Sequence, residues 1–122
     1  MATLLARFEE VTADELDELS PGELDGLPFG VIGMDADGIA RVYNATESRL
    51  AGLAPARVLG QPFFQAIGQC MNNYLVAQRF EDEPVLDAVI PYVLTLRMRP
   101  TPVRLRLLAM PGATFRYLLI ER

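Results

Sequence analysis

The 122-residue sequence contains no histidine, no lysine and a single cysteine, Cys70. Without histidine, Ser-His and Cys-His catalytic pairs, histidine-ligated haem and the common histidine-containing zinc sites are excluded. Without lysine, the phosphate-binding GxxxxGK[ST] loop is excluded as well. One cysteine forms no internal disulfide and holds no cysteine-only metal cluster, so a reducing cytosol is the expected compartment. No paired-acid spacing stands out, and we do not expect an enzyme.

Long hydrophobic runs are also absent, although apolar residues make up 51% of the chain. This content fits a folded globular protein and not a disordered one. No stretch approaches the roughly 18 consecutive apolar residues of a membrane span. The first 19 residues turn acidic at once and do not resemble a secretory signal. We therefore expect one cytoplasmic domain with its own hydrophobic core.

The charges are unevenly spread along the chain. Residues 1–37 carry ten acidic side chains against Arg7 alone, whereas the remainder carries six acidic side chains and ten arginines. One interpretation is two solvated faces of opposite sign. The alternative is that the acidic N-terminal segment lies against the arginine-bearing strands or against a partner. The net charge of −5 argues against binding to nucleic acid, because phosphates would be repelled.

Local signals divide the chain into short helices followed by strands. The segments "TADE" (12–15) and "SPGE" (20–23) are capping-box patterns, and each predicts the start of a short helix. The turn sequence "DADG" (35–38) predicts a hairpin. Asn44 is expected to cap a helix that ends near Ala51. The other expected elements are hairpin strands at 29–35 and 39–44, a turn or helix at 55–60, a loop at 60–73, a helix at 73–83, and strands at 88–98, 103–110 and 114–121.

This order of elements predicts an α+β fold with one central five-stranded antiparallel sheet flanked by short helices. Both early strands are too apolar to be solvated on one side, so helices are expected to cover part of the sheet. The plan resembles that of PAS-type domains, which are sensor or interaction modules. We divide the single domain into an N-terminal helical cap, residues 1–26, and a PAS core, residues 27–122. Fold alone does not fix function.

Three segments resemble the photoactive yellow protein family. They are "GELDGLPFGVIGMDADGIARVYNATE" (22–47), "LGQPFFQAIGQC" (59–70) and "YVLTLRMRPTPV" (92–103). Their motifs are specific in combination: ELDGLPFG, YNAxE, two phenylalanines before a cysteine, and RMxPT, all in the family's order. The resemblance covers roughly residues 22–110, which is most of the chain.

The resemblance implies a blue-light receptor that holds p-coumaric acid as a thioester on Cys70. It also implies signalling through chromophore isomerisation and proton transfer. We infer that partial unfolding follows, with the N-terminal helices as the element released. A downstream signalling domain or protein is the expected partner. One hypothesis is that the chain is the light-sensing part of a longer receptor. The oligomeric state stays open.

The residue chemistry agrees with a bound aromatic acyl group. Cys70 falls in an expected loop, where functional residues gather on a rigid scaffold. Phe63 and Phe64 are either ordinary core residues or walls for a flat ligand. Gly68 suits a close approach of backbone and ligand. Besides Cys70, the residues assigned to the chromophore pocket are Ile32, Tyr43, Glu47, Ala51, Leu53, Phe63, Ile67, Gly68, Gln69, Leu94, Leu96 and Met98.

Tyr43 and Glu47 are four residues apart, a spacing that places side chains on one face once a helix starts. From the residues alone, Asn44 and Glu47 form a capping-box pattern, in which the Glu47 side chain accepts a main-chain N–H group at the start of the helix. The resemblance instead implies that Tyr43 and Glu47 donate hydrogen bonds to the phenolate oxygen of the chromophore. Glu47 would then be protonated in the dark and would give its proton to the phenolate after illumination. The carboxylate left in the interior is expected to be unpaired and costly.

Several positions depart from the family pattern. Ala51 stands where other members have a threonine that steadies the tyrosine hydroxyl, and Leu53 stands where they have an arginine that covers the pocket. Leu96 replaces a tyrosine and Gln69 replaces a proline. Met98 matches the methionine that assists thermal re-isomerisation. The departures leave the colour and the kinetics of the protein open.

Two other classes of protein stay open. One is a PAS module that binds another small ligand or a protein partner, with Cys70 as a buried hydrophobic residue. The other is a thiol-reactive, redox-sensing protein. In a chain without lysine or histidine, only an arginine or a helix N-terminus would lower the pKa of the thiol.

Overall fold

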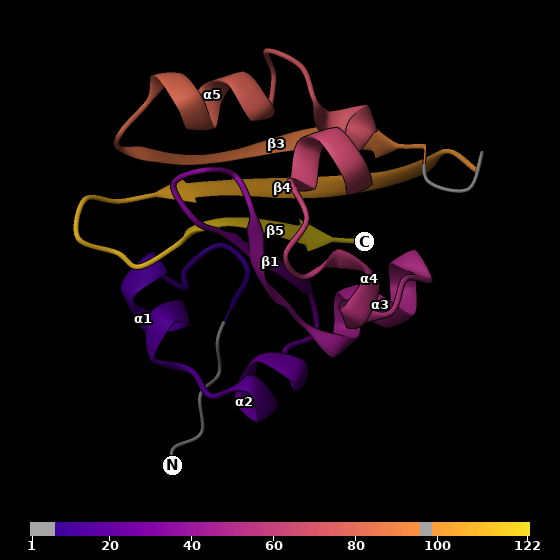
Figure 1. The fold of residues 1–122 in the computed structure, drawn as a ribbon, viewed down its shortest axis with the longest axis horizontal. Helices are drawn as coiled ribbons and strands as arrows, with labels where there is room; N and C mark the ends of the chain where they lie inside the picture. Colours follow the sequence, from indigo (N-terminus) through magenta and orange to yellow (C-terminus); the bar gives the residue numbers. More distant parts are fainter. Residues whose placement is uncertain (1–6, 96–98) are drawn as a thin grey trace.

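The computed structural model describes residues 7–95 and 99–122. The described chain begins with two short helices, continues through a hairpin and a helical connection, and ends in three long strands (Figure 1). In chain order the elements are α1 (Ala13–Glu18), α2 (Pro21–Asp25), β1 (Gly30–Met34), β2 (Ala40–Tyr43), α3 (Ala45–Ala51), α4 (Pro55–Val58), η1 (Phe63–Ile67), η2 (Gln69–Met71), α5 (Ala77–Asp82), β3 (Leu86–Leu94), β4 (Thr101–Ala109) and β5 (Arg116–Glu121).

The five strands form one antiparallel sheet in the order β2-β1-β5-β4-β3. The hairpin strand β1 therefore lies next to the C-terminal strand β5, with Gly30 opposite Ile120. The sheet and its short helices confirm the predicted α+β plan. Asp35 holds the β1–β2 turn by accepting the N–H groups of Asp37 and Ile39, and Gly38 supplies the positive φ of 79° that the turn requires.

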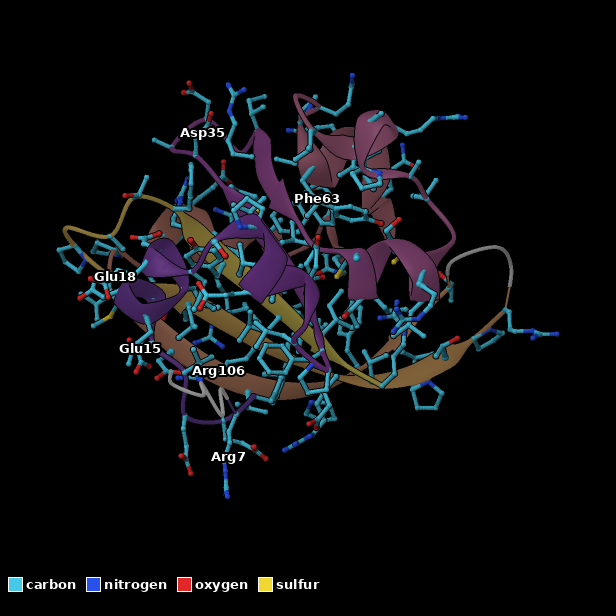
Figure 2. All side chains as sticks on the ribbon, turned by 90° about the horizontal axis from the view of Figure 1, so that it is seen from below. Arg7, Glu15, Glu18, Asp35, Phe63 and Arg106 are labelled. Atoms are coloured by element: carbon cyan, nitrogen blue, oxygen red, sulfur yellow. The ribbon has the colours of Figure 1, made fainter. Side chains whose placement is uncertain are left out.

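Helical segments cover both faces of the sheet. Side chains alternate along β5, so that Leu118 and Ile120 enter one hydrophobic cluster while Tyr117 and Leu119 enter another. The first cluster packs beneath η1 and α5, and the second packs beneath α1 and α2. Figure 2 shows Phe63 among the segments that follow β2 and Arg106 beside the N-terminal segment. The apolar character of the early strands follows from this double burial.

The charge pattern follows both interpretations in part: the N-terminal segment lies against the arginine-bearing strands, but most of its acidic side chains are exposed. Arg104 of β4 pairs with Glu9 at 2.7 Å. Arg106 is buried and donates to the carbonyl oxygen of Phe8 at 2.8 Å, and it also pairs with Asp87 of β3 at 2.9 Å. Both predicted capping boxes are present, at Thr12 and Ser20 as N-caps. Polar contacts as well as apolar packing therefore hold the N-terminal segment against the sheet.

The expectation of a loop over residues 60–73 is wrong, because most of this segment is helical. Residues Phe63–Ile67 form a π-helix and Gln69–Met71 form a turn of 3₁₀-helix. The N–H group of Gly68 donates to the carbonyl oxygen of Phe63 at 2.8 Å, five residues back. A π-turn does not follow the 3.6-residue period, which explains the weak periodicity of this stretch.

The remaining boundaries differ by a few residues. Helix α5 begins at Ala77 instead of residue 73, because the Asn73 side chain accepts the N–H groups of Leu75 and Val76 and forms a turn there. Strand β3 begins two residues earlier than expected and carries Pro91 in its middle. Because β3 is an edge strand, proline is tolerated in it. Within the described residues, no helix is long and apolar enough to cross a membrane.

Candidate functional site

The hydroxyl group of Tyr43 is buried without a hydrogen-bond partner. Tyr43 ends strand β2 opposite Ile32 of β1 and is 7% exposed. Its hydroxyl oxygen is the one buried side-chain oxygen or nitrogen, in the part of the chain that the structure describes, that lacks a partner. Burial, and secondarily the charge of Glu47, raises the pKa of Tyr43 to about 12, so the group is a neutral donor. An unpaired buried hydroxyl costs about 1–3 kcal/mol, which indicates a place for an absent acceptor.

Tyr43 opens onto a small apolar cavity between α3, η1 and the sheet. The enclosed space of the cavity is about 10 Å³, which is room for one water molecule. Among the side chains that line the cavity, only Tyr43 and Glu47 carry polar groups, a hydroxyl and a carboxyl group. The full lining is Tyr43, Glu47, Ala51, Leu53, Phe63, Ile67, Gly68, Met71 and Ile120. A flat ligand with one polar end matches this distribution of polar and apolar groups.

Glu47 lies on the first turn of α3 and is 2% exposed. Its Oε1 atom occupies the space that a Cβ atom at position 30 would fill, so the glycine at the start of β1 makes room for the carboxyl group. The guanidinium group of Arg122 donates two hydrogen bonds to it, at 2.8 Å to Oε1 and 3.2 Å to Oε2. The expectation that an ionised Glu47 would be unpaired is therefore corrected: the carboxylate has a cationic partner 75 residues away in sequence.

Two opposing effects act on the pKa of Glu47. Burial is the larger and raises the pKa above its ordinary value of 4.5, whereas the hydrogen bonds and the charge of Arg122 lower it. The net shift of the pKa is upward, so the interior favours the neutral form of Glu47 more than water does. Perturbed acids of this kind are typical of functional sites.

Asn44 connects the start of α3 to β1 and to the N-terminal helices. Its Oδ1 atom accepts the N–H groups of Val31 and Glu47, both at 3.0 Å. Its Nδ2 atom donates to the carbonyl oxygens of Leu24 at 2.8 Å and Phe29 at 3.0 Å. The predicted cap is present, but only the main chain of Glu47 takes part in it. The side chain of Glu47 is directed to Arg122 and not back to the cap.

Cys70 is half-buried in the 3₁₀ turn and packs against the cluster that contains the cavity. It does not itself line the cavity, but its neighbours Gly68 and Met71 do. The carbonyl oxygen of Cys70 accepts the hydroxyl of Tyr92 at 2.6 Å, and the Asn73 side chain donates to the Tyr92 oxygen at 2.7 Å. These bonds to β3 fix the main chain at the thiol.

Gly68 allows the π-helix to close over the cavity. A Cβ atom at this position would meet the ring of Phe63, 2.6 Å from its Cε2 atom, so only glycine permits the observed packing. Phe63 is 2% exposed, and its ring contacts that of Phe64 edge to face. Phe63 lines the cavity and Phe64 does not, so one of the two rings is a wall of the cavity and the other is a core residue.

The structure brings together seven of the predicted pocket residues: Tyr43, Glu47, Ala51, Leu53, Phe63, Ile67 and Gly68. Ile32 and Leu94 are buried in the same hydrophobic cluster but do not line the cavity. Gln69 is exposed, and its amide donates to the carbonyl oxygen of Gln65 at 2.8 Å, away from the cavity. Leu96 and Met98 lie outside the described residues.

Sequence reasoning missed three residues of the site: Met71, Ile120 and Arg122. Ile120 has the same parity along β5 as the buried Leu118, so the period of two placed it on this face of the sheet, and Arg122 follows directly after the strand. That signal says which face they share but not which helix they meet. The pairing of Gly30 with Ile120 brings them to α3.

The fold and this cavity define a PAS-type sensory module with a buried polar pair at the end of an apolar site. No protein-family model matches the sequence. The chain is 32% identical over 93 residues to a photoactive yellow protein of Rhodothalassium salexigens, covering 74% of each protein. It is 31% identical over 97 residues to a photoactive yellow protein of Halochromatium salexigens, covering 77% of the chain and 78% of the relative. The chain belongs to the photoactive yellow protein family.

Solved structures agree with this assignment. The chain is similar to the photoactive yellow protein domain of the sensor histidine kinase Ppr from Rhodospirillum centenum, with a TM-score of 0.82 and 32% identity over 90% of this chain and 99% of that domain. A PAS domain of an HTR-like protein from Haloarcula marismortui has a TM-score of 0.65 at 19% identity, which shows the shared fold. The protein is a photosensory PAS domain of a signal-transduction system.

Proposed function

We propose that this protein is a blue-light receptor that carries p-coumaric acid as a thioester on Cys70. The observation that carries the proposal is the buried Tyr43 hydroxyl, which has no partner among the described residues and faces a cavity beside Glu47. A phenolate oxygen at the end of this cavity would accept from both groups. The polar groups at this end of the cavity therefore match the phenolate end of the group that the family implies.

When bound, p-coumaric acid supplies the absorption of blue light and a double bond that isomerises. The chain supplies the surroundings. The Tyr43 hydroxyl and a protonated Glu47 donate short, charge-assisted hydrogen bonds to an anionic oxygen, which offset the cost of its desolvation. Phe63, Ile67 and Leu53 exclude water from the site. Cys70 provides the sulfur for the ester, held in place by the Tyr92 and Asn73 hydrogen bonds to its main chain.

Proton release by Glu47 is the step that connects the site to the rest of the protein. Glu47 follows directly on Asn44, Ala45 and Thr46, each of which is bonded to α2 or to the residues just after it. The Ala45 N–H group donates to Asp25 at 2.7 Å, and the Thr46 hydroxyl donates to the carbonyl oxygen of Leu27. A change in the charge of Glu47 would strain these bonds. Release of α1 and α2 is therefore the proposed structural output, received by a downstream signalling domain or protein.

The proposal is tested by reconstitution with an activated ester of p-coumaric acid. The wild-type protein is expected to gain a visible absorption band. Its Cys70 peptide is expected to gain the mass of p-coumaric acid less one water. Cys70→Ala is expected to fold and to stay colourless, whereas the control Gln69→Ala, at an exposed neighbouring position, is expected to load normally.

Two results would contradict the proposal. An adduct that survives in Cys70→Ala would place the attachment elsewhere. A wild-type protein that stays colourless with a freely titrating thiol would favour a PAS module that binds another ligand or a partner. Far-UV circular dichroism of each variant shows whether a lack of colour has a structural origin.

A further inference from the structure

Glu47 has two potential partners on opposite sides, and they require opposite protonation states. On the cavity side, an anionic ligand oxygen requires a neutral carboxyl group that donates, as the Tyr43 hydroxyl does. On the other side, the Arg122 guanidinium group donates at 2.8 and 3.2 Å and requires an acceptor. A carboxylate with two oxygens in a fork geometry is the best acceptor for arginine. One carboxyl group does not satisfy both partners fully at the same time.

The ion pair between Glu47 and Arg122 lies in the interior and not on the surface. The side chain of Glu47 is 3% exposed and that of Arg122 is 17% exposed. Gly30 leaves the space in which Oε1 lies, and its pairing with Ile120 brings the end of β5 to the same place. Arg122 follows directly after β5, and its two hydrogen bonds to Glu47 direct it toward α3.

We propose that Arg122 is the counter-ion that receives Glu47 when the carboxyl group loses its proton, so that Glu47 changes partner between the cavity and the end of β5. This inference rests on the proposed function, in which Glu47 is the proton donor. A buried carboxylate without a partner is strongly destabilising, whereas one with a bidentate arginine is much less so. Arg122 therefore stabilises the state formed after proton release. It also couples the protonation of the site to the position of the C-terminal strand.

The groups that act on the Glu47 carboxyl group come from two elements packed against α3. Tyr43 on β2 lies on the cavity side and is neutral near pH 7, because its pKa is raised to about 12. Arg122, next to the end of β5, is the cation on the other side. Arg122 lowers the pKa of Glu47, so replacing Arg122 by a neutral residue is expected to raise that pKa.

The first test needs no chromophore. Infrared spectroscopy of the full chain follows the carbonyl band of the neutral Glu47 carboxyl group as pH is varied, with Glu47→Gln identifying the band. Arg122→Gln is expected to move the midpoint of this band to higher pH, because the favourable interaction with the carboxylate is lost. Arg49→Gln, at an exposed position on the same helix, is expected to leave the midpoint unchanged. Arg122→Lys keeps the cation and is expected to restore most of the wild-type midpoint.

The second test uses the loaded protein. Arg122→Gln is expected to shorten the lifetime of the light-induced state about tenfold, the factor that corresponds to one pKa unit of lost stabilisation. An unshifted infrared midpoint in Arg122→Gln would overturn the inference even in a protein that binds the chromophore. Failure of loading with a shifted midpoint would instead contradict the proposed function and leave the ion pair standing. If Arg122→Gln does not fold, Arg122→Ala takes its place. A midpoint moved to higher pH in Arg122→Ala supports the pair, and an unchanged midpoint and lifetime contradict it.

Discussion

The carboxyl oxygen Oε1 of Glu47 lies in the space that a Cβ atom of residue 30 would occupy, so Gly30 is the residue that admits Glu47 to the interior. Glu47 lies on α3 and Gly30 at the start of β1, and the two elements pack directly on each other. The close approach fixes the carboxyl group between the cavity and Arg122. The placement of the acid therefore depends on a glycine 17 residues earlier in the chain.

Gly30→Ala is expected to displace the Glu47 side chain and to lower the stability of the protein. Overpacking of a filled interior costs about 1–3 kcal/mol in the free energy of unfolding. Urea unfolding monitored by circular dichroism measures the loss. Gly22→Ala, where an added Cβ meets open space, is the matched control. Equal stability of Gly30→Ala and wild type would mean that the carboxyl group moves aside without cost.

Glu47→Gln is expected to move the absorption band of the loaded protein to longer wavelength. An amide is a weaker donor than a carboxylic acid and stabilises a phenolate in the ground state less well. The cap of α3 survives, because Asn44 accepts the main-chain N–H group of residue 47. Light-induced loss of helical signal is also expected to shrink, since no carboxylate is formed. An unshifted spectrum would show that the side chain of Glu47 does not contact the chromophore.

Ala51→Thr is expected to lower the pH at which the loaded protein loses its yellow colour. Ala51 lines the cavity, and no described residue donates to or accepts from the Tyr43 hydroxyl. A new hydrogen bond to that hydroxyl is worth about 0.5–1.5 kcal/mol. The braced Tyr43 hydroxyl would stabilise the phenolate of the chromophore and lower the chromophore's pKa by about one unit at most. Absorbance titrations of both proteins give the midpoints, and identical midpoints would show that the threonine does not reach Tyr43.

The stability of the chromophore-free protein is expected to depend on pH through Glu47. The pKa of Glu47 in the folded state is raised above its unfolded value of about 4.5 by burial, although Arg122 opposes the shift. The folded state therefore binds more protons in the interval between the two values, and stability falls as pH rises through that interval. Glu47→Gln removes this contribution. Urea unfolding from pH 4 to pH 8 is expected to show a difference between the two proteins that grows with pH and then levels off. A constant difference would indicate an unshifted pKa.

Tyr117→Phe is expected to loosen the N-terminal helices. The Tyr117 hydroxyl donates to Asp17 of α1 at 2.6 Å, and Asp17 also accepts the N–H group of Thr114 at 2.6 Å. A hydrogen bond to a charged acceptor is worth about 1.5–3 kcal/mol. Hydrogen exchange of α1 amides is expected to accelerate, and Tyr74→Phe, at a 77% exposed position, serves as the control. Unchanged exchange in both variants would mean that apolar packing alone holds α1.

The sequence by itself determined the features that depend on neighbours three to five residues apart. Both capping boxes, the turn at Gly38 and the helix that Asn44 starts are correct as predicted, because their hydrogen bonds close within a few residues. The order of the elements, with a hairpin first and three strands last, also indicated an antiparallel sheet. These patterns, together with the family motifs, were sufficient for the fold and for most of the cavity lining.

The tertiary structure alone decided how the polar groups of the site are paired. Arg122 is 75 residues from Glu47 in the chain, and the two meet only because β5 pairs with β1 in one register and α3 packs on β1. Strand register depends on the whole sheet, so no local pattern states it. The same holds for Tyr43, whose hydroxyl has no partner among the described residues. The Glu47 carboxyl group is bonded to Arg122, and the other side chains that line the cavity are apolar. A capping pattern and a buried acid look alike in sequence, and burial is a property of the packed molecule.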